Sequence, residues 1–136
     1  MVRPRLRAYL VACPPAHPSI DRSGARLAGF LAGHELADAR PWLADLAAVE
    51  WASNELYDGR DGTPLGIDAL RAIPPEELGD LRLGLVPCHA RIASTHAIAP
   101  VLAGDADEPA GEPCTIAVWR PAYTVKRHPA PGPRSA

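Results

Sequence analysis

Residues 41–57 read PWLADLAAVEWASNELY, and this stretch decides the fold. Proline is favoured in the first turn of a helix, which is the place of Pro41. The apolar residues that follow at helical spacing are Trp42, Leu43, Leu46, Ala47, Val49 and Trp51. Asp58 and Gly59 then provide a stop signal. We therefore predict one principal helix over 41–57.

The two tryptophans of this helix point in different directions. Trp42 and Trp51 are nine residues apart, which is about 900° of rotation and places them on opposite sides of the helix. Either the helix is buried all round, or one tryptophan faces a partner, because aromatic side chains are enriched in interface cores.

The segments before and after this helix carry weaker signals. Residues 1–18 are rich in arginine and proline and are predicted to be extended, while 19–33 should form a helix that ends at Gly33. A short helix is predicted over 68–73. Another is predicted over 75–85, where early prolines and two glutamates suit a helix N-terminus.

The pattern changes after Pro87 from helical to strand-like. The expected elements are a strand at 88–94, a short helix or turn at 97–103, a loop at 104–113, a strand at 114–119, a turn at Pro121, a strand at 123–128 and a disordered tail at 129–136. Strand 114–119 is apolar on both faces and should be central. The sequence thus predicts an α+β fold, with N-terminal helices followed by a small antiparallel sheet in one domain over 19–128.

Composition excludes several classes of protein. The chain has 136 residues and a net charge of −2, with a basic beginning, an acidic middle and a basic end, which argues against a broad nucleic-acid surface. It has no apolar run of the roughly 20 residues that a membrane span needs, and no secretory signal. Its three cysteines do not suggest a disulfide framework. We expect a cytoplasmic protein.

No group of residues has the spacing of a catalytic or metal site. Cys88 and His89 are neighbours on a predicted strand and point to opposite faces. His89 and His96 are seven residues apart without a carboxylate at ligand spacing. Asp45 and Glu50 are five apart, so they do not stack on one helix face; they either brace neighbouring loops or touch a partner. We expect no catalytic residues, no metal ligands and no cofactor in this chain.

Three segments together resemble a known family. PWLADLAAVEWA at 41–52, PPEELGDLRLGLVPCHARI at 74–92 and TIAVWR at 115–120 are similar to the HvfC/BufC-type family, which includes methanobactin biosynthesis protein C. The resemblance covers roughly 19–128. Longer relatives begin with an additional helical segment, which we expect this chain to lack.

The resemblance implies an accessory role in the biosynthesis of ribosomally made peptide natural products. Members bind a precursor peptide through a winged-helix-like element that recognises its leader. They form a heterodimer with a TIM-barrel multinuclear iron oxidase, which modifies the peptide, often at Cys. Iron would then belong to the partner enzyme and not to this chain.

Two sets of residues are candidates for these contacts. Strand 123–128 is amphipathic with a lysine on its solvent side, as suits a sheet edge to which a peptide can add as a strand. The candidate peptide-binding residues are Trp119, Arg120, Tyr123, Val125, Lys126 and Arg127. The candidate partner-interface residues are Trp42, Asp45, Glu50, Trp51 and Arg82, on helices 41–57 and 75–85, with Trp42 expected to need cover by the partner.

Other interpretations are open at this point. A winged-helix DNA-binding module would use basic residues near the hairpin, namely Arg91, Arg120, Lys126 and Arg127, although 75–85 carries only Arg82 against three acidic residues. An independent enzyme would use Cys88 or a histidine pair. The hairpin could also serve only to close the core.

Overall fold

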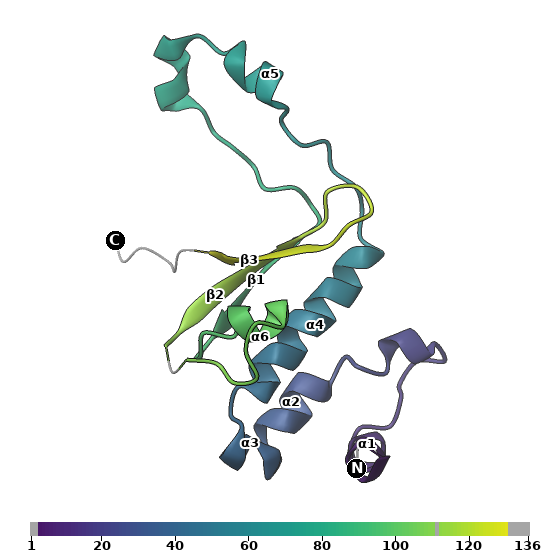
Figure 1. The fold of residues 1–136 in the computed structure, drawn as a ribbon. Coiled ribbons are helices and arrows are strands. Elements are labelled where there is room, and N and C mark those ends of the chain that lie inside the picture. Colours follow the sequence, from purple (N-terminus) through teal and green to yellow (C-terminus); the bar gives the residue numbers. More distant parts are fainter. Residues whose placement is uncertain (1–2, 111, 131–136) are drawn as a thin grey trace.

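The computed structural model describes residues 3–110 and 112–130 and shows helices followed by a small sheet, which confirms the predicted α+β fold (Figure 1). The elements in chain order are α1 (Arg3–Ala12), the 3₁₀ helix η1 (Ile20–Arg22), α2 (Leu27–Ala32), α3 (Leu36–Ala39), α4 (Leu43–Tyr57), α5 (Ile67–Arg71), the 3₁₀ helix η2 (Pro75–Asp80), β1 (His89–Ser94), α6 (Ala99–Ala103), β2 (Cys114–Trp119) and β3 (Lys126–Ala130). No helix in the described part of the chain has both the length and the apolar character needed to cross a membrane.

The sheet has three antiparallel strands in the order β1-β2-β3. His89 pairs with Trp119 at one end of the β1–β2 ladder, and Ser94 pairs with Cys114 at the other. On the other side of β2, Trp119 also pairs with Lys126. The central position predicted for strand 114–119 is therefore confirmed, and β3 forms an edge of the sheet.

The core lies where α4 crosses one face of this sheet (Figure 1). The buried residues at its centre are Trp42 and Val49 from the α4 region, Ile98 before α6, and Ile116 and Val118 of β2. Ile116 and Val118 are two residues apart, so they share the sheet face that is turned toward α4. That face of the sheet is buried in the core, together with Val49 and Ile98.

The prediction of an extended N-terminal segment over 1–18 is wrong, because residues 3–12 form α1. One aromatic residue anchors this helix. Tyr9 is buried, its hydroxyl donates to the carbonyl oxygen of Ser23, and its ring meets Phe30 edge-on at a centroid distance of 5.4 Å. These contacts are with distant residues, and the prolines after position 13 obscured the helical signal.

Residues 19–33 form two short elements instead of one helix. A turn separates η1 from α2, and within it Gly24 lies against the ring of Trp51, where an added Cβ would come within 3.2 Å of a ring carbon. The close approach of α4 thus interrupts the helix that the sequence pattern predicts.

The predicted helix over 75–85 is also wrong. Only the 3₁₀ helix η2 forms, and residues 81–86 continue as an irregular segment. The leucines after η2 have no core to bury against, since Leu83 and Leu85 remain 69% and 71% exposed. Without that burial, the helical pattern has no tertiary packing to stabilise it.

The last strand is displaced from its predicted position at 123–128. β3 begins at Lys126 and continues to Ala130, so the first two residues of the predicted disordered tail at 129–136 belong to the sheet. Residues 131–136 lie outside the described residues. The turn predicted at Pro121 is present, and it includes Ala122 with a φ of 54°.

Residues 61–87, here called the arm, leave the end of α4 and return to β1. The arm carries α5 and η2 at its outer end and projects away from α4 and the sheet (Figure 1). None of its residues is buried.

Candidate functional site

The outer side of β3 is the first candidate for a binding site. β3 pairs with β2 on one side, and Lys126, Arg127 and His128 are all exposed along it. The next residue, Pro129, has no N–H to donate and is tolerated in a sheet at an edge strand. Pro129 cannot donate to β2, and backbone groups two residues apart turn to the same side of a strand, so we expect the N–H and C=O of Arg127 to turn outward.

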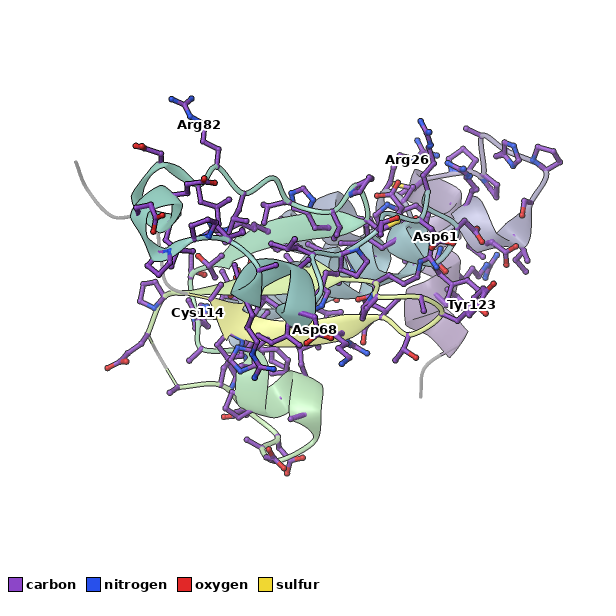
Figure 2. The ribbon with its side chains drawn as sticks, turned by 90° about the horizontal axis from the view of Figure 1, so that it is seen from above. Arg26, Asp61, Asp68, Arg82, Cys114 and Tyr123 are labelled. Atoms are coloured by element: carbon purple, nitrogen blue, oxygen red, sulfur yellow. The ribbon has the colours of Figure 1, made fainter. Side chains whose placement is uncertain are left out.

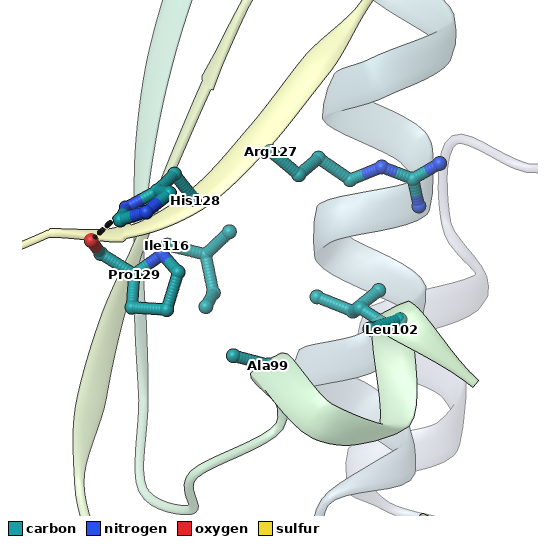
Figure 3. Close-up of a pocket in the computed structure, with 7 residues that line it drawn as sticks. Ala99, Leu102, Ile116, Arg127, His128 and Pro129 are labelled. Atoms are coloured by element: carbon teal, nitrogen blue, oxygen red, sulfur yellow. Dashed lines mark hydrogen bonds between the residues drawn. The ribbon is translucent and has the colours of Figure 1, made fainter. Parts of the chain in front are cut away.

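A cleft of about 270 Å³ accompanies this edge on the side of α6. Its lining residues are Ala99, Leu102, Ala103, Ile116, Arg127, His128 and Pro129. Figure 3 shows Leu102 and Ala99 of α6 on one side of the cleft and the β3 residues on the other. The cleft therefore offers an apolar floor next to a cationic side chain and an open strand edge.

Arg120 occupies the interior, which differs from the surface position expected of a peptide-binding residue. Its Nε donates to the Leu56 carbonyl oxygen at 2.7 Å, and one Nη donates to the Gly59 carbonyl oxygen at 2.6 Å. It also binds the carbonyl oxygen of Ala122, and its ion pair with Asp61 measures 2.8 Å. Arg120 thus joins α4, the arm and the turn before β3.

The charge of Arg120 is maintained in this position. Burial acts to lower the pKa of the guanidinium, but the hydrogen bond to the Cys88 thiol and the Asp61 carboxylate outweigh it, so the pKa is raised above its ordinary value. Arg120 therefore acts as a permanent cation that fixes the base of the hairpin.

The other candidate peptide-binding residues lie around β3 but do not share one face. Val125 packs against the core, and Tyr123 lies in the preceding turn with 83% of its surface exposed. Trp119 and Lys126 are directly paired and lie on the sheet face opposite to α4. Arg127 is the candidate that borders the cleft.

The candidate partner-interface residues are dispersed. Trp42 is only 9% exposed and belongs to the core, so the prediction that it needs cover by a partner is wrong. Glu50 is exposed, and Trp51 is half-buried beside Gly24. The helix α4 is therefore not buried on all sides, and its Trp42 side faces the core. Arg82 lies on the arm, at the opposite side of the molecule from Tyr123 (Figure 2).

Asp45 braces a loop, which is one of the two alternatives that the sequence left open. Its Oδ2 accepts hydrogen bonds from the Ser94 hydroxyl at 2.8 Å, from the Thr95 N–H at 3.1 Å and from the Thr95 hydroxyl at 3.2 Å. Asp45 therefore ties the first turn of α4 to the end of β1.

The described residues contain no group of three or more His, Cys, Asp or Glu side chains that could hold a metal ion. Cys88 is buried, with its thiol donating to the Arg60 carbonyl oxygen at 2.7 Å, while the neighbouring His89 is exposed. The Cys88 thiol therefore lies inside the protein and the His89 ring on its surface, so the two do not form a nucleophile–base pair.

One further surface was not predicted from the sequence. A cavity of about 490 Å³ lies between the base of the arm and the sheet face opposite to α4, with Leu65 and Leu85 on the arm side and Ala117 and Trp119 on the sheet side. Trp119 in its wall is half-buried, and the path of the arm could not be derived from local patterns.

Comparison of the chain with models of protein families, with curated proteins and with solved structures gives no match in any of the three.

Proposed function

We propose that this chain is a non-catalytic subunit that binds a ribosomally synthesised precursor peptide and presents it to a multinuclear iron oxidase in the cytoplasm. The observation that supports the proposal best is the β3 edge, with its exposed Lys126 and Arg127 beside an apolar cleft. The resemblance of 41–52, 74–92 and 115–120 to the HvfC/BufC-type family supplies the expected partner, a TIM-barrel enzyme that contains the iron and forms a heterodimer with this chain.

An extended peptide can add to β3 as a fourth strand, which gives affinity through the main chain. Pairing would centre on Arg127, because Pro129 has no N–H to offer at the next outward position. The alternate side chains of the peptide would then meet the cleft at Leu102 and Ile116. Acidic residues of the leader would lie near Lys126 and Arg127, where charge affects mainly the rate of encounter and the register.

The DNA-binding alternative has less support. Arg120, one of its four basic residues, is engaged inside the protein, and the segment at 75–85 that would serve as a recognition helix forms only a 3₁₀ helix. The described helix that carries several basic residues is α1, with the sequence RPRLRAYLVA, and it lies outside the segments on which the winged-helix interpretation rests.

Peptide titration tests the proposal. The probes are labelled synthetic peptides of the short open reading frames beside the gene, measured by fluorescence anisotropy at low and high salt. Lys126→Glu with Arg127→Glu should weaken binding more at low salt than at high salt, because salt screens the attraction. Arg22→Glu with Arg40→Glu changes the charge equally at exposed positions outside the sheet and should leave binding unchanged.

A backbone readout accompanies this titration. On binding, the amide hydrogen of Arg127 should exchange more slowly with solvent, as expected for a new strand partner. Circular dichroism confirms that each variant is folded. Equal affinity of the folded Lys126→Glu/Arg127→Glu variant and the parent at low salt would contradict the electrostatic part of the proposal, and an unprotected Arg127 amide would contradict the strand addition.

A further inference from the structure

The arm exposes an unusual number of large apolar side chains. Five of them are between 47% and 71% exposed, namely Leu65, Ile67, Leu78, Leu83 and Leu85. Large apolar side chains that are exposed together on one segment of a folded protein are typical of an interaction site. The arm therefore needs a surface on which these side chains can be buried.

The base of the arm is held in place by close packing and by an ion pair. Gly59 and Gly62 lie close to the segment that returns to β1. A Cβ added at Gly59 would lie 2.5 Å from Cys88 Sγ, and one added at Gly62 would lie 2.5 Å from Pro87 Cδ. The ion pair of Asp61 with Arg120 holds the same point. The arm already contributes Leu65 and Leu85 to the cavity over its own sheet. The side chains farther out, Ile67, Leu78 and Leu83, do not line that cavity and are between 47% and 69% exposed.

The sheet face opposite to α4, here called the outer face, is a receptor of matching character. Its residues, identified by the register of the ladders, include His89, Arg91, Ala117, Trp119, Lys126 and His128. The cavity of about 490 Å³ opens on this face, with Trp119 and Ala117 in its wall. The outer face thus combines an apolar cavity with a basic border.

The charges of the arm and the outer face are opposite. Asp61 is paired with Arg120. The rest of the arm contains four acidic residues, Asp68, Glu76, Glu77 and Asp80, and two basic ones, Arg71 and Arg82, so its net charge is −2. The outer face has the cations Arg91 and Lys126 and two histidines. Such complementarity favours association and fixes its orientation.

From this we propose that two copies of the chain associate reciprocally, with the arm of each copy seated on the outer face of the other. Each copy supplies both a donor surface and an acceptor surface, which is the requirement for a closed two-fold dimer. The contact uses the sheet face opposite to the α6 cleft and shares only Lys126 with the candidate peptide-binding residues near that cleft, so Arg127→Glu alone should weaken peptide binding without affecting the dimer.

Sedimentation equilibrium tests the association directly. The parent chain should show a dimer whose population increases with concentration. Leu78→Glu with Leu83→Glu should shift it to monomer, because two carboxylates would have to be desolvated in the contact. Val11→Glu with Ile20→Glu introduces the same change at apolar residues that are 74% and 84% exposed outside the arm, and it should leave the dimer intact.

A charge exchange tests the pairing of the two surfaces. Glu76→Lys with Glu77→Lys makes the arm basic, and Lys126→Glu with His128→Glu makes the outer face acidic. Each variant alone should dimerise at least about tenfold more weakly at low salt, since like charges then face each other. An equimolar mixture should restore the dimer, because in the mixed pair both contacts join opposite charges.

Three results would overturn the proposal. The first is a parent chain that stays monomeric over the whole concentration range. The second is a dimer that none of these arm or outer-face variants affects. The third is a monomer in which the backbone amides of the arm are protected from hydrogen exchange, which would show that the arm closes on its own sheet.

Discussion

The side chain of Arg120 closes the C-terminal end of α4, since its Nε donates a 2.7 Å hydrogen bond to the carbonyl oxygen of Leu56, 64 residues earlier in the chain. The last carbonyl groups of a helix have no partner within the helix and require one from elsewhere. Here the Gly59 N–H donates to the Leu56 oxygen at 3.2 Å, and Arg120, directly after the central strand, supplies a further donor. The helix and the sheet are therefore joined by a directional contact as well as by apolar packing.

Replacement of Arg120 by Met should lower the melting temperature by several degrees, because several carbonyl oxygens lose their donor in the interior. Arg120→Lys should recover only part of the loss, since one ammonium group cannot reproduce the planar fork of donors. Thermal unfolding followed by circular dichroism measures both. Arg127→Ala, at an exposed site, serves as the control, and an equal effect of the two substitutions would refute the role of Arg120.

Asp45→Ala should destabilise the fold by about 1–3 kcal/mol, because the hydroxyl of the buried Ser94 and the Thr95 amide lose their common acceptor. Glu50→Ala on the same helix is the matched control and should change the free energy of unfolding by less than about 0.5 kcal/mol. Urea unfolding provides the values. If the two variants were equally stable, the bracing of the β1 end by Asp45 would have no energetic importance.

Local patterns predict well those elements in which the buried residues recur at the spacing of a helix or of a strand. α4 and β2 have apolar residues at helical and strand spacing, and both lie where the sequence places them. In contrast, α1 depends on Tyr9 meeting Phe30 and Ser23, contacts that no local pattern contains. The same holds for Arg120, whose sequence neighbours suggest a surface hairpin but whose partners include Leu56 and Gly59, more than sixty residues earlier in the chain.

Trp42→Ala should cost about 3–5 kcal/mol, as is typical for the removal of a large buried aromatic side chain. Trp51→Ala should cost clearly less, because this side chain is half-buried beside Gly24. Both values come from denaturant unfolding monitored by circular dichroism, which avoids the loss of the fluorophore. The opposite order of the two costs would show that the core is centred on Trp51.

The glycines at the base of the arm should be sensitive to a single methyl group. Gly59→Ala and Gly62→Ala place a Cβ 2.5 Å from neighbouring side-chain atoms, and overpacking of this kind costs about 1–3 kcal/mol. Gly66→Ala and Gly84→Ala meet open space in the arm itself, and they should leave the stability within about 0.5 kcal/mol.

Differential scanning calorimetry distinguishes the two pairs of glycine variants. If Gly66→Ala and Gly84→Ala lowered the melting temperature as strongly as Gly59→Ala and Gly62→Ala, the close packing at the base would be contradicted. An unchanged melting temperature for all four would show that the base can relax at little cost.

The fixed base of the arm makes its outer part a module whose length can vary. Because the ends of the arm are held together at Gly62 and Pro87, the arm is attached to the core as a closed loop. The entropic cost of closing a loop increases only with the logarithm of its length, by about 0.6 kcal/mol for each doubling. Insertions and deletions between these two positions should therefore accumulate without loss of the fold, and a foreign recognition sequence could be grafted there.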